Sequence, residues 1–316
     1  MIKQFGRTLI ELMIAMAIGV IIVLGMSALY SSAVQSTRLA TQFGNMSEDT
    51  PLALHIIGQA IKRAGYGEII GTSVAPTDQT LFAFPHLRAC RSSGFIDPAS
   101  GDFNCTAAAA GAPDSLFVQF QSDSIAAAPQ RNSQDCLGAS GVLTTISDEA
   151  HAAYLAQVPL ISNLFTLAGS TITCSGNNAP AQAMASNVAE FRIYFGFDEV
   201  AATQALSGLT SASPGASTIV DADYIQTKQA GFAGRKISAW DFVVSVHLCS
   251  VATTQSKGTS VATAVSYEGC PDDAGQVLLP AGPTRSASDG TVRKTYRQVY
   301  TIRSKATGSP SFRAGP

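Results

Sequence analysis

Residues 9–30 of the chain form an almost unbroken apolar run. No charged side chain occurs between Leu12 and Leu29, and most positions there are Leu, Ile, Val, Met or Ala. A helix over residues 9–30 would be about 33 Å long, which is enough to cross the hydrocarbon core of a bilayer. Because the run is apolar on all sides, we expect a membrane-spanning helix over residues 7–30 rather than a helix of a soluble core. A cleaved secretory signal peptide is another alternative, since small residues stand at 27–28 and 31–33.

Residues 31–66 keep a helical period but become amphipathic. Their apolar residues form two series, Val34, Leu39, Phe43 and Met46, and then Leu52, Ile56, Ile57, Ala60 and Ile61. Pro51 stands between the two series. Because proline lacks a backbone N–H, we expect a kink or a new helix start at this position. Gly65 is the predicted C-terminal cap of the helix.

Beyond residue 66 the apolar positions alternate with polar ones. The clearest alternating series are Leu116, Val118 and Phe120, then Phe191, Ile193 and Phe195, and then Phe242, Val244, Val246 and Leu248. A period of two predicts half-buried strands, and charged or hydroxyl residues between them predict an antiparallel sheet with one face open to solvent. The amphipathic helix is the natural cover for the other face. Small-residue tracts at 107–112, 126–129, 201–216 and 253–263 predict long surface loops. The expected fold class is therefore α+β.

The composition of the chain excludes some classes of protein but does not assign a function. Hydrophobic residues make up 46% of the chain and charged residues 13%, with a net charge of −2, so a disordered chain and a diffuse basic field for nucleic acid are both disfavoured. Basic residues do gather near the C-terminus, at Arg285, Arg293, Lys294, Arg297, Arg303 and Lys305. We interpret them as solvated strand edges, and a DNA-binding strip is the alternative.

No catalytic, cofactor or metal signature stands out. The P-loop, the nucleophile elbow and the H-E-x-x-H zinc motif are absent, and no two of the four histidines have the i, i+4 spacing of a helical metal site. The acidic pairs Asp221/Asp223 and Asp272/Asp273 lack EF-hand spacing and are interpreted as solvated turns. We therefore predict no catalytic residue, no cofactor and no metal ligand, and a protein that is not an enzyme.

The six cysteines all lie outside the apolar run, at Cys90, Cys105, Cys136, Cys174, Cys249 and Cys270. An even number without C-x-x-C spacing favours disulfides in an oxidising compartment over a zinc site. Fifteen pairings are possible. The simplest joins sequence neighbours, Cys90–Cys105, Cys136–Cys174 and Cys249–Cys270.

The N-terminus resembles the prepilin signature of type IV pilins and type II secretion pseudopilins. The resemblance rests on Gly6, then one residue, then Thr8-Leu9-Ile10-Glu11 and the apolar run. It implies that a prepilin peptidase cuts between Gly6 and Arg7, that the new N-terminus is methylated, and that Glu11 aligns with a neighbouring subunit's N-terminus during assembly. Arg7 replaces the phenylalanine that usually follows the cut, and it is also a possible intrachain partner for Glu11.

The rest of the chain is similar to the PilW family of type IV pilus minor pilins. The similar segments follow in order, at 61–66, 114–120, 135–138, 163–167, 188–196, 240–249 and 297–303. The resemblance implies a non-catalytic subunit of the inner membrane that primes the pilus with other minor pilins and the major pilin. It also implies a place at the pilus tip, display of an adhesin, and roles in adhesion and twitching motility.

Two other functions stay open at this point. A minor pseudopilin of type II secretion, of the J type, would share the helix, the glutamate and the fold. A membrane-anchored periplasmic enzyme is the less favoured alternative. The predicted organisation is a leader at 1–6, a membrane and assembly helix at 7–30, an amphipathic helix at 31–66, and a periplasmic β-rich domain at 67–316.

Overall fold

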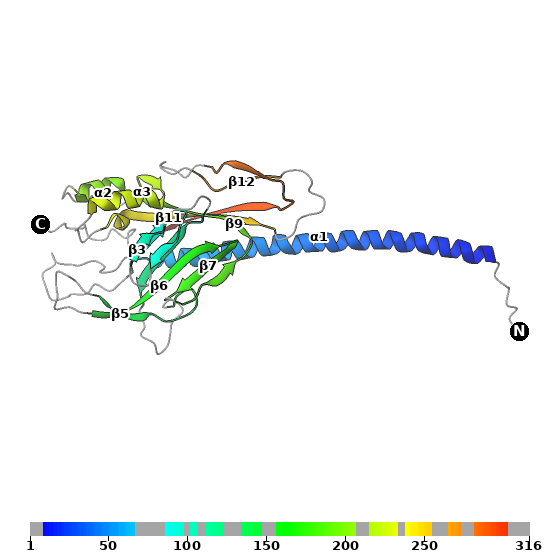
Figure 1. Cartoon of the computed structure of the whole chain (residues 1–316), viewed down its shortest axis with the longest axis horizontal. Helices are drawn as coiled ribbons and strands as arrows, with labels where there is room; N and C mark the ends of the chain where they lie inside the picture. The colour runs from blue at the N-terminus through cyan, green and yellow to red at the C-terminus, as the bar shows by residue number, and fades with distance from the viewer. Residues whose placement is uncertain are drawn as a thin grey trace. The chain divides into compact units, whose positions relative to one another are not determined.

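The computed structural model describes residues 9–66, 86–97, 102–106, 112–122, 134–146, 156–177, 179–206, 215–232, 238–254, 265–272 and 281–302. The chain divides into two compact units, Met1–Ser47 and Glu48–Pro316. One helix, α1 (Leu9–Arg63), contributes to both units (Figure 1).

The first unit is the N-terminal part of α1, which exposes large apolar side chains on all sides. Leu9, Ile21 and Leu29 are 78%, 69% and 74% exposed. By length and composition this helix can cross a membrane, with a mean hydropathy of 2.6 over its most apolar window. The Ser27 hydroxyl donates to the Val23 carbonyl oxygen at 2.8 Å, so this polar group is satisfied within the helix, as lipid requires.

Pro51 does not end the helix. Residues 9–63 form one continuous helix, so the predicted new start at Pro51 is wrong. A proline removes only one intrahelical hydrogen bond. The next turns bury Ala53, Leu54 and Ile57, each 0–1% exposed. Their packing outweighs the lost hydrogen bond.

The second unit contains two main antiparallel sheets and two short hairpins. The six-stranded sheet has the order β1-β4-β6-β7-β8, with β5 also paired to β6. Its strands are β1 (Leu87–Cys90), β4 (Ser115–Gln121), β5 (Val142–Ile146), β6 (Ala156–Ala168), β7 (Thr171–Gly176) and β8 (Gln182–Ala185). The four-stranded sheet has the order β10-β9-β11-β14. Its strands are β9 (Val188–Phe197), β10 (Thr218–Val220), β11 (Val243–Thr253) and β14 (Arg293–Thr301).

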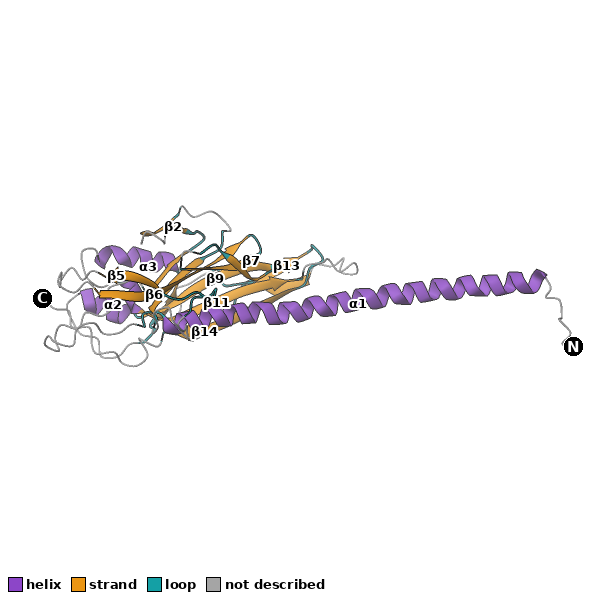
Figure 2. Cartoon of the chain, turned by 90° about the horizontal axis from the view of Figure 1, so that it is seen from below, coloured by secondary structure: helices purple, strands orange, loops and turns teal. Residues whose placement is uncertain are grey.

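The smaller elements lie around these sheets (Figure 2). The hairpins are β2 (Phe95–Asp97) with β3 (Asp102–Cys105), and β12 (Val265–Glu268) with β13 (Thr284–Ala287). The helices are α2 (Glu199–Leu206), α3 (Ala222–Gln229) and the 3-10 turns η2 (Ala230–Phe232) and η3 (Ala239–Phe242).

One apolar core joins the end of α1 to both sheets. Its helical members include Leu54, Ile57 and Ile61, all 0% exposed, and its largest side chain is Trp240, which meets the Phe195 ring edge-on at 5.3 Å. The predicted packing of the amphipathic helix on antiparallel strands is therefore confirmed. The strands form two sheets rather than one.

Gly65 ends α1 as predicted. Its φ of 70° lies in the left-handed region that glycine adopts freely. The Tyr66 N–H donates back to the Arg63 carbonyl oxygen at 2.8 Å, and the Gly65 N–H donates to the Gln119 carbonyl oxygen at 3.1 Å. The helix end is thereby joined to β4.

The second face of the four-stranded sheet is less open than predicted. Tyr194, Cys249 and Val251 are 0–4% exposed and form a second apolar cluster with Ile219 and Cys270. A disulfide joins Cys249 on this face to Cys270, which follows β12, so the β12–β13 segment covers it. Exposure persists at β14, where Val299 is 59% exposed.

One predicted loop contains a helix. Residues 201–206 of the predicted 201–216 loop belong to α2, and Ala201 and Ala202 are buried in the core. The Asp198 carboxylate accepts from the Ala201 N–H at 2.8 Å, in the manner of an N-cap, and alanine has the highest helix propensity. Thr253, the first residue of the predicted 253–263 loop, belongs to β11. Residues 107–111, 126–129, 207–214 and 255–263 of the predicted loops lie outside the described residues.

Gly58 gives a direct test of how α1 packs. A Cβ at this position would fall on the Tyr300 ring, whereas a Cβ at Gly44, in the same helix, would meet nothing within 4 Å. We expect Gly58→Ala to lower the free energy of unfolding by about 1–3 kcal/mol through overpacking. Thermal unfolding of the full chain in detergent measures it. Gly44→Ala is the matched control and should cause no loss of stability; equal effects would contradict this packing.

His247 makes stability depend on pH. Its ring lies on the partly covered face of β11, Nε2 is 3.2 Å from the Ser245 hydroxyl oxygen, and burial lowers the pKa of His247. The unfolded chain therefore takes up a proton near pH 6.5 that the folded chain still rejects. We expect stability to fall as pH drops below about 6.5, by at most about 1.4 kcal/mol per pH unit from this group.

Urea unfolding at pH 7.5 and pH 5.5 measures this loss. His247→Gln should reduce the difference between the two pH values, while the other three histidines contribute equally to both proteins. An unchanged difference in the variant would assign the pH dependence to other groups.

Candidate assembly and processing site

The N-terminal part of α1 combines a long apolar surface with one carboxylate. Glu11 lies in the first turn of the described helix, and the next charged residue along the chain is Arg38. Leu9, Ile10, Leu12 and Met13 around it are 51–78% exposed. A carboxylate in such a setting costs a few kcal/mol in lipid unless a positive charge compensates it. The helix N-terminus supplies part of that compensation.

The predicted cleavage residues Gly6 and Arg7 lie outside the described residues. Their role stays a prediction from the sequence. The structure places Glu11 on the helix that directly follows them, in a segment exposed on all sides. Chemically, this segment can pack against other apolar helices and bind one cationic group beside Glu11.

Three disulfides join the cysteines as sequence neighbours. Cys90 pairs with Cys105, Cys136 with Cys174, and Cys249 with Cys270, closing separations of 15, 38 and 21 residues. In the chain-entropy model each such link stabilises a fold by about 2–4 kcal/mol. Disulfides of this kind persist in oxidising compartments, which agrees with a domain outside the cytoplasm.

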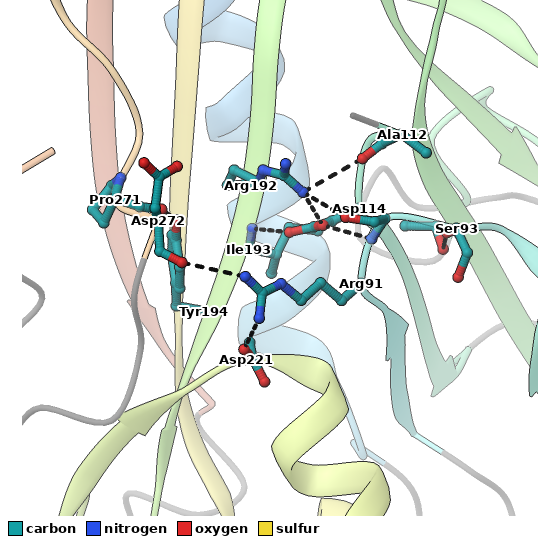
Figure 3. Close-up of polar contacts among 12 residues, drawn as sticks. Arg91, Ser93, Ala112, Asp114, Arg192, Ile193, Tyr194, Asp221, Pro271 and Asp272 are labelled. Carbon is teal, nitrogen blue, oxygen red and sulfur yellow. Dashed lines mark hydrogen bonds and ion pairs between the residues drawn. The ribbon is translucent and has the colours of Figure 1, made fainter. Parts of the chain in front are cut away.

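An ion pair between the buried Asp114 and the partly exposed Arg192 connects the two main sheets (Figure 3). Asp114, at the start of β4, is 4% exposed and accepts from the Ile193 N–H of β9 at 2.8 Å and from the Ser92 N–H at 3.0 Å. Its Oδ1 also lies 3.0 Å from Nη1 of Arg192. Burial raises the pKa of Asp114, and these hydrogen bonds and the Arg192 charge oppose that rise. The sequence showed Asp114 only as the residue before a strand.

A second group of polar contacts lies beside the Asp114–Arg192 pair (Figure 3). Arg91 pairs with Asp221, which also caps α3 by accepting from the Tyr224 N–H at 2.9 Å. Arg91 Nη2 donates to the Asp272 carbonyl oxygen at 3.2 Å, and the Tyr194 hydroxyl donates to the Pro271 carbonyl oxygen. Asp221 and Asp272 therefore hold segments of this domain together. Within the described residues, no group of three or more acidic, histidine or cysteine side chains could hold a metal ion.

The basic residues near the C-terminus are largely matched by carboxylates. Arg285 pairs with Glu190 at 2.8 Å and with Asp272 at 2.7 Å. Arg293 pairs with Asp289 at 2.8 Å, and Arg297 pairs with Glu268 at 2.7 Å. Arg303 and Lys305 lie outside the described residues. The Arg285–Glu190 and Arg297–Glu268 pairs fasten the β12–β13 hairpin to the four-stranded sheet, so these charges have a structural role.

Comparison with known proteins adds a finding at the N-terminus. Residues 1–27 match the family model described as "Prokaryotic N-terminal methylation motif". The chain therefore carries a prepilin-type N-methylation motif, which implies processing by a prepilin peptidase. No curated protein matches the chain. Among solved structures, a type IV-like pilin from Thermus thermophilus is similar over 82% of this chain and 98% of that chain, with 12% sequence identity and a TM-score of 0.36.

We expect loss of the Asp114–Arg192 ion pair to destabilise the fold more than loss of an exposed ion pair. Asp114→Ala leaves the Ile193 and Ser92 N–H groups without their acceptor and Arg192 without its carboxylate, and should lower the free energy of unfolding by at least about 2 kcal/mol. Lys228→Ala removes one partner of the exposed Lys228–Glu199 pair, which is 2.8 Å long, and is the matched control. Denaturant unfolding of both variants should show at most about 1 kcal/mol for the control; a similarly small loss for Asp114→Ala would show that the Asp114–Arg192 pair is not structural.

Proposed function

We propose that this protein is a minor pilin, a non-catalytic subunit that is anchored in the inner membrane, processed by prepilin peptidase and then built into a type IV pilus. The observation that carries the proposal is the methylation motif at residues 1–27, continued by a helix whose large apolar side chains are exposed on all sides. Such a surface needs lipid or other apolar helices around it.

Glu11 supports a role of that helix in assembly with neighbouring subunits. A permanent membrane anchor gains nothing from a carboxylate inside its apolar segment, because lipid penalises the charge. A neighbouring subunit with a free, methylated N-terminus would bring a positive charge to Glu11. Pairing of the two charges would then favour the assembled state over the dispersed one.

The disulfide-linked domain is suited to exposure on the outside of such a fibre. Three disulfides and several ion pairs stabilise its segments, which suits a protein exposed outside the cell. The finer assignment to the PilW family rests on the ordered sequence resemblance. It implies priming of the pilus tip with other minor pilins and the major pilin, and display of an adhesin.

Processing tests the proposal first. In a host with prepilin peptidase, the mass of the chain should correspond to a start at N-methylated Arg7, and Gly6→Val should leave the leader attached. Gly19→Val is the matched control, because a side chain at Gly19 meets nothing within 4 Å, and it should be processed normally. A wild-type chain that begins at Met1, or is cut after the apolar run, would refute the proposal.

Glu11 tests the assembly step separately. Glu11→Gln should still be cleaved, but its amount in sheared fibres should fall at least about tenfold, because each 1.4 kcal/mol of lost pairing is a factor of ten. Glu48→Gln, a neutralisation outside the apolar run, should assemble normally. Normal incorporation of Glu11→Gln would show that charge pairing does not drive assembly.

A deletion strain distinguishes a pilus from a secretion system. Loss of surface pili with normal protein secretion supports the minor pilin. Loss of exoprotein secretion with normal pili would assign the chain to a type II secretion pseudopilus.

A further inference from the structure

The chain contains two tripeptides with the N-x-[ST] pattern of N-glycan acceptors. They are Asn45-Met46-Ser47 and Asn104-Cys105-Thr106. Such a tripeptide acts as an acceptor only when a transferase can bind it from outside the folded chain, so local structure separates the two.

The first tripeptide lies inside a helix. Asn45 to Ser47 are part of α1, and the middle residue, Met46, is buried. Presenting Asn45 to an enzyme would require several turns of this helix to unwind.

The second tripeptide lies at the end of the β2–β3 hairpin, which pairs with neither main sheet (Figure 2). Asn104 and Thr106 are both exposed. The hairpin has only two paired positions, Phe95 with Cys105 and Asp97 with Asp102, and an irregularity between them. A two-stranded hairpin of this size is marginally stable by itself, so opening it costs little before the Cys90–Cys105 disulfide closes.

We propose that Asn104 is an N-glycosylation site, and that its glycan comes from an oligosaccharide linked to a polyprenyl diphosphate. The amide nitrogen Nδ2 of Asn104 attacks C1 of the first sugar and forms a C–N bond. The bond from C1 to the diphosphate oxygen breaks, polyprenyl diphosphate leaves, and a base of the transferase takes the Nδ2 proton. The proposal rests on the proposed function only in requiring that the domain after α1 is exported.

The Cys90–Cys105 disulfide sets the order of events. Cys105 is the middle residue of the acceptor tripeptide, and its partner Cys90 is 0% exposed. Once formed, the disulfide ties the tripeptide to the end of β1. The Thr106 N–H then donates to the Gly94 carbonyl oxygen at 2.9 Å, and the Thr106 hydroxyl donates to the same oxygen at 3.2 Å. Transfer therefore precedes closure of the disulfide, and the two reactions compete.

Peptide mass spectrometry of the full chain from its native membrane tests the site. After the disulfides are reduced, which frees Cys105 from Cys90, trypsin releases residues 92–131, in which Asn104 is the single asparagine, and residues 39–62, in which Asn45 is the single asparagine. We expect sugar mass on the first peptide and none on the second. Thr106→Val should abolish the modification, and Thr106→Ser should retain it.

A disulfide variant tests the order of events. Cys90→Ser removes the competing link and should raise the modified fraction of the 92–131 peptide relative to wild type. If occupancy is unchanged, transfer and disulfide closure do not compete.

An unmodified 92–131 peptide in the wild-type chain overturns the proposal. The mass of the N-terminus distinguishes this from failure of the proposed function. A chain that begins at Arg7 with an unmodified peptide refutes glycosylation alone, whereas a chain that begins at Met1 with an unmodified peptide refutes both.

Discussion

The packing of the end of α1 into the apolar core is the interaction on which the second unit depends. Leu54, Ile57 and Ile61 are fully buried there together with side chains of both main sheets. The helix can approach β14 closely because residue 58 is glycine and leaves room for the Tyr300 ring. The helix end is joined to β4 through Gly65, so one segment organises strands that come from distant parts of the chain.

Ion pairs and disulfides add to the apolar core in joining the segments of the second unit. The Asp114–Arg192 pair joins the two sheets, and Arg285 with Glu190 fastens the β12–β13 hairpin to the second sheet. Disulfides reinforce the same segments, since Cys249–Cys270 ties this hairpin to β11. A domain built this way tolerates an exposed, oxidising environment. Among the described residues, Arg192, Arg285 and Arg297 use their charges to join separate segments of the domain.

The two units differ in how their apolar side chains are kept from water. The N-terminal helix exposes apolar side chains that water cannot solvate favourably, while the second unit buries its apolar side chains in a core of its own. A protein of this composition must place the first unit in lipid or among other helices. The methylation motif at residues 1–27 covers most of this exposed helix segment, which agrees with a helix that is processed at the membrane.

The sequence by itself determined the features that depend on neighbouring residues. The length of the apolar run, the amphipathic period after residue 31, the cap at Gly65 and the alternation of β4, β9 and β11 follow from local patterns. The prepilin motif is also local, because a peptidase binds a short continuous segment. The helix through Pro51 was not predictable in this way, because the burial that offsets the lost hydrogen bond comes from distant strands.

Only the tertiary structure decided which segments meet. Asp114 binds residues 78 and 79 positions away, and no local pattern distinguishes it from an aspartate in a solvated turn. The division into two sheets, the cover over Tyr194, and the choice of one disulfide pairing among fifteen likewise depend on chain segments brought together by the core. Long-range contacts of this kind depend on the packing of the whole domain, and a single sequence does not display them.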